Sequence, residues 1–275
     1  MRKVPYVKLK DGNRLWYEEK GKGMPIVFIH GYGASSWDFS NQIDYFSKAY
    51  RVFAFDHKGH GKSDRPEDAS YTLPEFAEEL SQALDKLVGA EKFVLIGHSM
   101  GGFISLIYAT TPNFKKRLKG LILMSTAPKF ANPGVQEYVN LIKKGEMSLE
   151  PNLENMNNIM VPLCFNEKYI QTHEDTIKKF VEEGLKNSEY VLFKTTIDIA
   201  DHYNIEDKLE EIDVPTLILT GDEDAFVFPE NSELMHRKIK NSELKIFSPK
   251  IGHYIQFEAL EEYNRVVENF LKKLQ

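Results

Sequence analysis

One serine of this chain has the neighbours that a nucleophile needs. Ser99 is the centre of the pentapeptide 97–101, Gly-His-Ser-Met-Gly, which follows the apolar run 93–96 and precedes the apolar, alanine-containing stretch 102–109. A strand, a sharp turn and a helix in this order hold one hydroxyl at the apex of the turn, and the glycines let strand and helix pass closely beside it. The pattern is typical of a nucleophile elbow and predicts that Ser99 attacks a substrate.

A serine hydroxyl becomes a good nucleophile only when a neighbouring base accepts its proton. The chain has eight histidines. His98 directly precedes Ser99 and would point away from it on a tight turn, so we expect it to pack beneath the loop. His253 follows Gly252 between the last predicted strand and the last predicted helix, at the edge of the sheet where function gathers. We therefore predict that His253 is the base, in preference to His30, His57, His60, His173, His202 and His236.

The base in turn needs a carboxylate that orients its ring. The predicted strand 118–124 runs into Ser-Thr-Ala without a carboxylate, whereas the strand 216–220 is followed by Asp222, Glu223 and Asp224. The acid is therefore expected from this second loop. The periodicity of the residues does not choose between Asp222 and Asp224, and we interpret Glu223 as a solvated side chain.

A sheet must bring these loops together. Two short strands around Asp11-Gly12 predict an N-terminal hairpin, because Asp-Gly favours a tight hairpin turn. After the hairpin, apolar runs alternate with amphipathic stretches, as in a parallel sheet. The predicted fold class is α/β, with a mostly parallel, twisted eight-stranded sheet, an N-terminal antiparallel hairpin and helices on both faces. The six further strands are expected at 25–29, 51–55, 93–96, 118–124, 216–220 and 243–247.

Five loops are expected at the carboxyl ends of the predicted strands, and they contain the residues described above. Because these ends meet at one edge of a parallel sheet, side chains that are distant in sequence come together there. The sequence therefore predicts one site, made by the loops 30–33, 56–64, 98–101, 221–226 and 248–254.

The alternation of strands and helices stops after the sixth strand and resumes about 90 residues later. A crossover between parallel strands needs only about a dozen residues, so the surplus is an insertion. We predict a core of residues 1–125 and 205–275 and a helical cap of residues 126–204, with the underside of the cap facing Ser99. Helices are expected at 134–144, 148–160, 165–184 and 188–200, punctuated by Pro128, Pro133, Pro151 and Pro162.

The composition limits the partners of the protein. A net charge of −6, from 35 basic and 41 acidic residues, disfavours nucleic acid or an anionic membrane as the main partner. A single cysteine, Cys164, allows no disulfide within the chain and no cysteine-based metal site. The first residues form no apolar secretory segment, and no run approaches the roughly 18 apolar residues of a membrane-spanning helix. We expect a cytoplasmic protein without nucleic-acid or membrane partners, and the oligomeric state stays open.

Several of these stretches together resemble the α/β-hydrolase superfamily, in particular its single-domain carboxylesterase and lactonase-like members with a helical cap. The motifs occur in the order of that family, which is serine, then acid, then histidine. The family places its acid in a Gly-x-x-Asp pattern, so the resemblance implies Asp224, after Gly221, with Asp222 as the alternative. The resemblance covers nearly the whole chain outside the insertion and rests on residues 26–33, 56–64, 94–102, 221–224 and 252–253.

The resemblance also implies where the negative charge of the reaction is held. The backbone N–H groups of Tyr32, in the His-Gly loop, and of Met100, directly after the serine, correspond to the oxyanion hole of the family. Ser99, Asp224 and His253 would then form a catalytic triad. The resemblance implies no metal ion and no organic cofactor.

We expect a serine hydrolase that acts on a small-molecule ester, with a small to medium apolar acyl group, through an acyl-enzyme intermediate. Lactonase, thioesterase, carbon–carbon bond hydrolase and cofactor-free perhydrolase activities would use the same triad and are alternatives. The acidic substrates of a carbon–carbon bond hydrolase would favour cationic residues in the cap, for which Lys129, Lys143 and Lys144 are candidates. A non-catalytic ligand receptor is a remote alternative, because this chain keeps all three triad residues.

Overall fold

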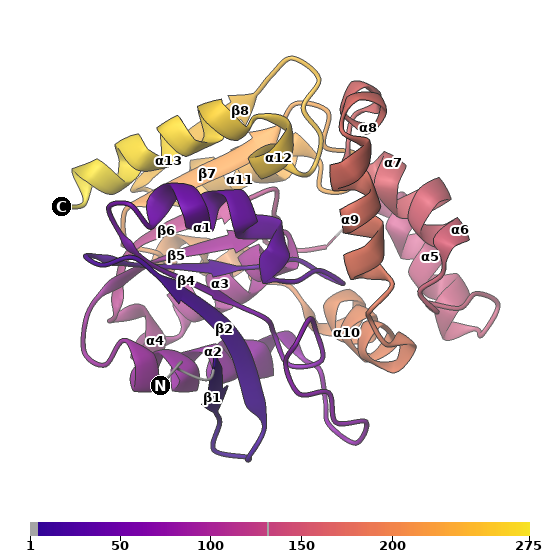
Figure 1. Ribbon diagram of the computed structural model, residues 1–275, viewed down its shortest axis with the longest axis horizontal. Coiled ribbons are helices and arrows are strands. Elements are labelled where there is room, and N and C mark those ends of the chain that lie inside the picture. The colour runs from indigo at the N-terminus through magenta and orange to yellow at the C-terminus, as the bar shows by residue number, and fades with distance from the viewer. Residues whose placement is uncertain (1–4, 131) are drawn as a thin grey trace.

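Eight strands form one sheet, in the order β1-β2-β4-β3-β5-β6-β7-β8, in the computed structural model, which describes residues 5–130 and 132–275 (Figure 1). β2 pairs antiparallel with β1 and with β4, and all other neighbours are parallel. This confirms the predicted α/β class with its N-terminal antiparallel hairpin. The strands are β1 (Tyr6–Lys8), β2 (Arg14–Lys20), β3 (Pro25–Ile29), β4 (Arg51–Phe55), β5 (Phe93–His98), β6 (Leu118–Met124), β7 (Thr216–Gly221) and β8 (Ser242–Phe247).

The central strands are covered on both faces, as their unbroken apolar runs predicted. Every residue of β3, β5 and β7 is buried. The helices α2 (Leu73–Leu87), α3 (Met100–Thr110) and α11 (Pro229–Lys238) contribute to the apolar layer on one face. The helices α1 (Ser40–Phe46) and α13 (Leu260–Lys273) contribute to the layer on the other face. The core therefore consists of two apolar layers separated by the sheet.

Short helical segments complete the chain outside the insertion: η1 (Ser36–Phe39), α4 (Pro112–Lys115), η3 (Glu206–Glu211) and α12 (Ile255–Glu258). α3, which follows Ser99, has 11 residues, and nearly all of them are buried. Across the described residues, no helix is both long enough and apolar enough to cross a membrane.

The segment between β6 and β7 folds into a run of helices that stand together at the right of Figure 1. Its two ends meet, because Lys129 and Asn204 form an antiparallel bridge and the Ile205 N–H donates to the Pro128 carbonyl over 2.8 Å. The division into a core and a cap of residues 126–204 stays a prediction. The helices are α5 (Pro133–Lys143), α6 (Leu153–Asn155), η2 (Met156–Met160), α7 (Val161–Cys164), α8 (Glu167–Thr172), α9 (Glu174–Gly184) and α10 (Glu189–His202).

The helix predicted at 148–160 begins later than expected. Its first residue is Leu153, because the side-chain oxygen of Asn152 accepts a hydrogen bond of 2.8 Å from the Asn155 N–H and caps the helix. Pro151 lies just outside it. Asparagine is among the best N-cap residues, so this start carried a signal in the sequence.

The same helix also runs further than expected. Pro162 was expected to end it near Met160, yet the chain continues helically to Cys164. The Val161 N–H donates to the Met156 carbonyl, five residues before it, which makes η2 a π-helical turn. Pro162 has no N–H to donate, and its ring would clash with a carbonyl four residues earlier in a regular helix. The wider π turn before Pro162 accommodates the proline.

The helix predicted at 165–184 is two helices. α8 begins at Glu167 after Asn166, whose side-chain oxygen accepts a hydrogen bond of 2.8 Å from the Tyr169 N–H. Between α8 and α9, His173 leaves the helical region, with φ of −130° and ψ of 49°. The prediction failed because one apolar stripe runs through both helices, and hydrophobic periodicity does not reveal a break of a single residue.

Candidate active site

Ser99 stands at a sharp turn between β5 and α3, as predicted. Its φ of 54° and ψ of −120° lie in a region that residues other than glycine rarely adopt. A Cβ atom at Gly97 would lie 2.3 Å from the Gly101 carbonyl oxygen, and one at Gly101 would lie 2.3 Å from the Ile29 carbonyl oxygen. Both positions therefore require glycine, and the strained turn presents the serine at the end of its strand.

Asp224 and His253 meet in the loops after β7 and β8. His253 Nδ1 lies 2.8 Å from Asp224 Oδ2 and 3.0 Å from Oδ1, and both residues are 2% exposed. The Asp224 carboxylate also accepts hydrogen bonds from the N–H groups of Phe226 and Val227, at 3.1 and 2.8 Å. The same carboxylate accepts the hydrogen bond of the His253 Nδ1–H. This hydrogen bonding assigns the proton to Nδ1 and leaves a lone pair on Nε2, as a base requires.

The second candidate acid, Asp222, has other partners. Its carboxylate accepts hydrogen bonds from the N–H groups of Lys250 and Ile251, at 3.2 and 2.8 Å. Lys250 has a φ of 60°, so these bonds hold a strained loop just before His253. The geometry favours Asp224 as the partner of the His253 ring, and Asp222 shapes the loop that carries this ring.

Ser99 and His253 line the same cavity. Within the described ranges, no hydrogen bond joins the Ser99 hydroxyl to the His253 ring, whose partner is Asp224. Contacts between a nucleophile and its base are often long in a site without substrate and shorten when substrate binds. The structure thus brings the three predicted residues to one place, with the Asp224–His253 contact already formed.

Two backbone N–H groups beside Ser99, those of Tyr32 and Met100, have no acceptor in the part of the chain that the structure describes. Met100 is the first residue of α3, and the leading N–H groups of a helix have no partner within it. Tyr32 lies in the loop after β3, where a Cβ atom at Gly31 would lie 3.1 Å from the Ser99 Cβ. Both amides therefore belong to residues next to the serine or its loop, and neither has another acceptor among the described residues.

The insertion makes hydrogen bonds to two loops of the site, the loop that contains Tyr32 and the loop that contains His253. The Tyr32 hydroxyl lies 2.8 Å from Thr196 Oγ1 of α10. The Cys164 carbonyl at the end of α7 accepts hydrogen bonds from the N–H groups of His253 and Tyr254, at 3.1 and 3.2 Å. The sequence held no signal for this second contact, because a main-chain carbonyl is independent of residue type.

Several other histidines are buried beneath the site. His30 Nε2 accepts from the His57 N–H at 3.1 Å, so its Nδ1–H donates to the Gly31 carbonyl at 2.8 Å. His98 Nε2 lies 3.0 Å from the carbonyl oxygen of His253, which fits its expected place beneath the loop. Burial lowers the pKa of His30 to about 4 and the pKa values of His57 and His98 well below the usual value. In the described part of the chain, no group of His, Cys, Asp or Glu side chains is arranged to hold a metal ion.

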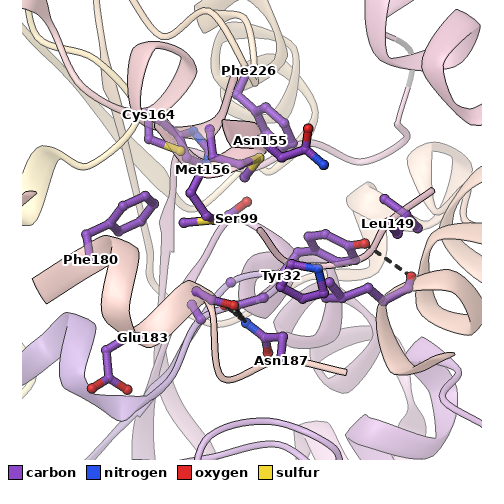
Figure 2. Close-up of a pocket in the computed structure, with 18 of the residues that line it drawn as sticks. Tyr32, Ser99, Leu149, Asn155, Met156, Cys164, Phe180, Glu183, Asn187 and Phe226 are labelled. Atoms are coloured by element: carbon purple, nitrogen blue, oxygen red, sulfur yellow. Dashed lines mark hydrogen bonds between the residues drawn. The ribbon is translucent and has the colours of Figure 1, made fainter. Parts of the chain in front are cut away.

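Two neighbouring cavities meet at Ser99 and are lined in large part by the insertion. We call the cavity of about 100 Å³ the small lobe and the cavity of about 300 Å³ the large lobe. Figure 2 shows Ser99 between Phe180 on one side and Tyr32 and Leu149 on the other. The residues common to both lobes are Tyr32, Ser99, Tyr138, Leu149, Asn155, Met160 and Phe226.

The three lysines considered for acidic substrates line neither lobe. Lys129 pairs with Glu206 at 2.7 Å, Lys143 pairs with Asp201, and Lys144 is exposed after the end of α5. Among the described residues that line the lobes there is no lysine or arginine. Within the described ranges, therefore, neither lobe offers a lysine or arginine side chain to a substrate carboxylate.

Asp38, in η1, lines the small lobe and was not predicted to belong to the site. It is 1% exposed, and burial raises the pKa of its carboxyl group to about 8. In the sequence it is an acid in the first helical turn after the 30–33 loop. That position does not distinguish a buried carboxyl group from a surface one.

Comparison with known proteins places the chain in a family. A family model described as alpha/beta hydrolase fold matches residues 24–260. A proline iminopeptidase from Thermoplasma volcanium is 30% identical, over 98% of this chain and 96% of its own length. A 2-hydroxymuconate semialdehyde hydrolase from Pseudomonas putida is 27% identical, over 96% and 92%. The structure of a thermophilic esterase from Thermogutta terrifontis is similar with a TM-score of 0.87 and 26% identity, over 98% of both chains. The chain belongs to the alpha/beta hydrolase fold family.

Proposed function

We propose that the protein is a serine hydrolase that cleaves carboxylic esters of small to medium apolar acyl groups, and that it does so in the cytoplasm. The observation that carries the proposal is the contact of 2.8 Å between His253 Nδ1 and Asp224 Oδ2, beside a cavity that Ser99 also lines. A buried imidazole, oriented by a carboxylate and next to a strained serine, is the arrangement that acyl transfer needs. Membership of a hydrolase family supports the same type of reaction.

In the first half of the proposed reaction, Ser99 Oγ attacks the ester carbonyl carbon and His253 Nε2 accepts the hydroxyl proton. Asp224 keeps the ring in the Nδ1–H form and stabilises the imidazolium ion that results. The bond to the alcohol oxygen then breaks, and His253 gives its proton to that oxygen. The acyl group stays on Ser99 as an acyl-enzyme.

The carbonyl oxygen becomes negatively charged when Ser99 attacks. We assign the N–H groups of Tyr32 and Met100 to this charge, since both lie beside the serine without another acceptor in the described chain. Loss of one such donor typically raises the barrier by about 2.7–4 kcal/mol. In the second half, water takes the place of the alcohol, His253 accepts a proton from it, and the acid is released.

The lining of the lobes supports neutral, apolar acyl groups. An acidic substrate of a carbon–carbon bond hydrolase would meet no lysine or arginine among the described lining residues. Lactones and thioesters present the same carbonyl group to the same residues and stay alternatives, as does a perhydrolase reaction. A non-catalytic receptor stays the remote alternative.

The test of the proposal is the hydrolysis of ethyl butyrate, followed by titration of the released acid. The wild-type protein should turn over, and Ser99→Ala should lose at least about 10⁴-fold in kcat/KM. Ser70→Ala, at an exposed serine that lines neither lobe, is the matched control and should keep the wild-type rate. Butyrolactone, a butyryl thioester and proline p-nitroanilide are measured in parallel.

Two results would overturn the ester assignment. One is a rate for Ser99→Ala that equals the wild-type rate. The other is efficient turnover of the lactone, the thioester or the anilide by a wild-type protein that leaves ethyl butyrate intact.

A further inference from the structure

The two lobes differ in chemistry as well as in size. His253 lines the small lobe and not the large one, whereas Met100 lines the large lobe and not the small one. The small lobe is lined by three carboxylic acids, Asp38, Glu150 and Glu183. The large lobe is lined mainly by apolar side chains, among them Phe103, Phe130, Val139, Ile159, Leu163 and Ile199.

The position of His253 determines which part of an ester enters each lobe. In the proposed reaction His253 passes the proton of Ser99 to the departing alcohol oxygen, so this oxygen must come within about 3 Å of the ring. The alcohol part therefore extends into the small lobe. The acyl chain leaves the carbonyl carbon in the other direction, past Met100, and enters the large lobe.

The volumes limit both parts of the substrate. A protein cavity of about 150 Å³ holds one benzene molecule, which has six carbon atoms. The large lobe, at about 300 Å³, has room for more than one such ring, whereas the small lobe, at about 100 Å³, takes a group smaller than the ring. The cavities thus fit a medium-sized acyl group and a compact alcohol.

One buried carboxyl oxygen of the small lobe lacks a hydrogen-bond partner. Asp38 is 1% exposed, and its Oδ2 atom has no hydrogen-bond partner in the described structure. A buried polar atom without a partner costs free energy, and a ligand that donates a hydrogen bond to it recovers this energy. Burial raises the pKa of Asp38, and a hydrogen bond with the Tyr254 hydroxyl lowers it by a smaller amount. A cation beside the carboxyl group would favour its ionised form.

Of the other two acids of this lobe, Glu150 is exposed to solvent and Glu183 is already paired with lysines. The Glu183 carboxylate lies 3.1 Å from Lys179 Nζ and 2.6 Å from Lys186 Nζ. Figure 2 shows this carboxylate turned away from Ser99. No lysine or arginine is among the described residues that line this lobe, so Asp38 Oδ2 is an acceptor without a partner at the wall of the lobe.

We infer that the site prefers esters in which a medium-sized apolar acid is joined to a compact alcohol that carries an ammonium group, and that Asp38 binds the ammonium N–H. The inference rests on the proposed ester hydrolysis and specifies its substrate. An ester of a neutral alcohol with the same shape leaves Asp38 Oδ2 without a donor. The preference appears in kcat/KM, because the alcohol part is still bound when Ser99 attacks.

The test compares two esters of the same shape, 2-(dimethylamino)ethyl hexanoate and 3-methylbutyl hexanoate. They differ in one position, where a protonated nitrogen that donates one hydrogen bond replaces a carbon atom. The wild-type protein should prefer the amine ester by about tenfold or more in kcat/KM, as expected for a charge-assisted hydrogen bond. Asp38→Asn should bring this ratio to about one. The matched control is Asp44→Asn, at an exposed aspartate that pairs with Lys20, and it should keep the ratio.

Equal kcat/KM values for the two esters in the wild type, or a preference that persists in Asp38→Asn, would overturn the inference. If Asp38→Asn does not fold, the binding of the two alcohol products to the wild-type protein tests the inference instead. 2-(Dimethylamino)ethanol should bind at least about tenfold more tightly than 3-methylbutanol in calorimetry, and equal binding would be contrary to the inference. If ethyl butyrate is not hydrolysed, the proposed function fails, and the binding experiment still tests Asp38.

The assignment of the lobes has a test of its own. Ile199→Trp fills the large lobe and should lower kcat/KM for ethyl hexanoate at least about tenfold relative to ethyl acetate. Cys164→Leu, in the small lobe, should instead reduce the rates of esters with longer alcohols. If Ile199→Trp changes the preference for alcohol length and not for acyl length, the lobes have been assigned the wrong way round.

Discussion

The loops around Ser99 and the insertion beside them are held in place by different atoms. In the core, main-chain atoms determine how closely neighbouring segments can approach, since a Cβ atom at Gly101 would lie 2.3 Å from the Ile29 carbonyl oxygen. In the insertion, a Cβ atom at Gly184 would also have a neighbour at 2.3 Å, but this neighbour is the terminal methyl group of Met156. A methionine side chain can turn aside, whereas a strand of the central sheet cannot move without displacing the nucleophile.

This difference separates the chemistry from the selectivity. The core loops need particular residues, because a Cβ atom, a lost N–H group or a shifted ring changes the geometry of the reacting atoms. The insertion needs volume and apolar surface, which many side chains supply. We therefore expect core substitutions to decide whether an ester is cleaved, and insertion substitutions to decide which ester is cleaved.

The largest effect is expected at the acid that orients the base. Asp224→Asn places an amide beside His253 Nδ1 and moves the ring proton to Nε2, which is the nitrogen that must accept a proton from the serine. The kcat for ethyl butyrate should fall by about 10⁴-fold. Asp222→Asn weakens only hydrogen bonds to the loop at Lys250 and Ile251, and should cost less than about tenfold. A greater loss in Asp222→Asn would transfer the role of the acid to that residue.

Replacing a glycine by alanine in each region tests whether the core is more tightly constrained than the insertion. Gly101→Ala should lower the free energy of unfolding by about 3 kcal/mol or more, because its methyl group meets the main chain of Ile29 and His30. Gly184→Ala should change it by less than about 1 kcal/mol, since the better helix propensity of alanine offsets the displacement of Met156. Urea unfolding measures both values. Equal losses would mean that the insertion is as tightly constrained as the core.

The histidines of the two regions should respond differently to pH. In the folded core, burial lowers the pKa of His30 to about 4 and that of His60 to about 3, whereas the unfolded chain has values near 6.5. The unfolded chain therefore binds protons first as the pH falls. This contribution to stability is complete above about pH 6.5 and is lost toward pH 4, by on the order of 3 kcal/mol per histidine.

Urea unfolding at a series of pH values measures this loss. His60→Gln should reduce the dependence of the unfolding free energy on pH below about 6.5, because the variant lacks one of the side chains that bind a proton on unfolding. His173→Gln, at an exposed position of the insertion, is the matched control and should leave the dependence unchanged. Equal slopes for wild type and His60→Gln would contradict the burial argument.

The smallest effect is expected where the insertion touches the His253 loop. Glu258 accepts hydrogen bonds from the Gly252 N–H at 3.1 Å, from the Asn166 N–H at 3.0 Å and from the Asn166 side chain. Asn166→Ala should lower the unfolding free energy by about 1 kcal/mol through the lost helix cap, and kcat/KM by about fivefold through the loosened loop.

Asn152→Ala is the control for that effect. It removes the equivalent cap of α6, and its side chain makes no hydrogen bond to Glu258 in the described structure. Stability should fall by a similar amount, about 1 kcal/mol, with the rate unchanged. A rate loss of the same size in both variants would show that the insertion acts on the reaction through its stability alone.

Much of the core followed from the sequence, because its signals are local. The Asp11-Gly12 turn marked the N-terminal hairpin, apolar runs marked the strands after it, and the Gly-x-Ser-x-Gly spacing marked the turn at Ser99. Parallel strands gather their carboxyl ends at one edge, which is why loops more than a hundred residues apart in sequence could be predicted to meet. The choice of Asp224 over Asp222 came from resemblance, and the contact with His253 now gives it a geometric reason.

The insertion and the selectivity of the site were less predictable, because their determinants are tertiary. A break at His173 and a π turn before Pro162 depend on single residues inside an otherwise continuous apolar stripe. The burial of Asp38 depends on what packs over η1, and the Cys164 carbonyl would make its contact with any side chain at that position. The sequence shows that apolar residues fill the insertion, but the sheet and the helices together determine how the cavity divides at Ser99.

The most direct test of the account is the labelling of the protein by a small alkyl fluorophosphonate, which reacts with a serine that a neighbouring base activates. We predict one adduct per chain, located on Ser99 by mass spectrometry of the digested protein. The labelling rate should fall by at least about 10²-fold in His253→Ala, which removes the base. An adduct on another residue, or a labelling rate that is the same in wild type and His253→Ala, would contradict the proposal that Ser99 is a nucleophile activated by His253.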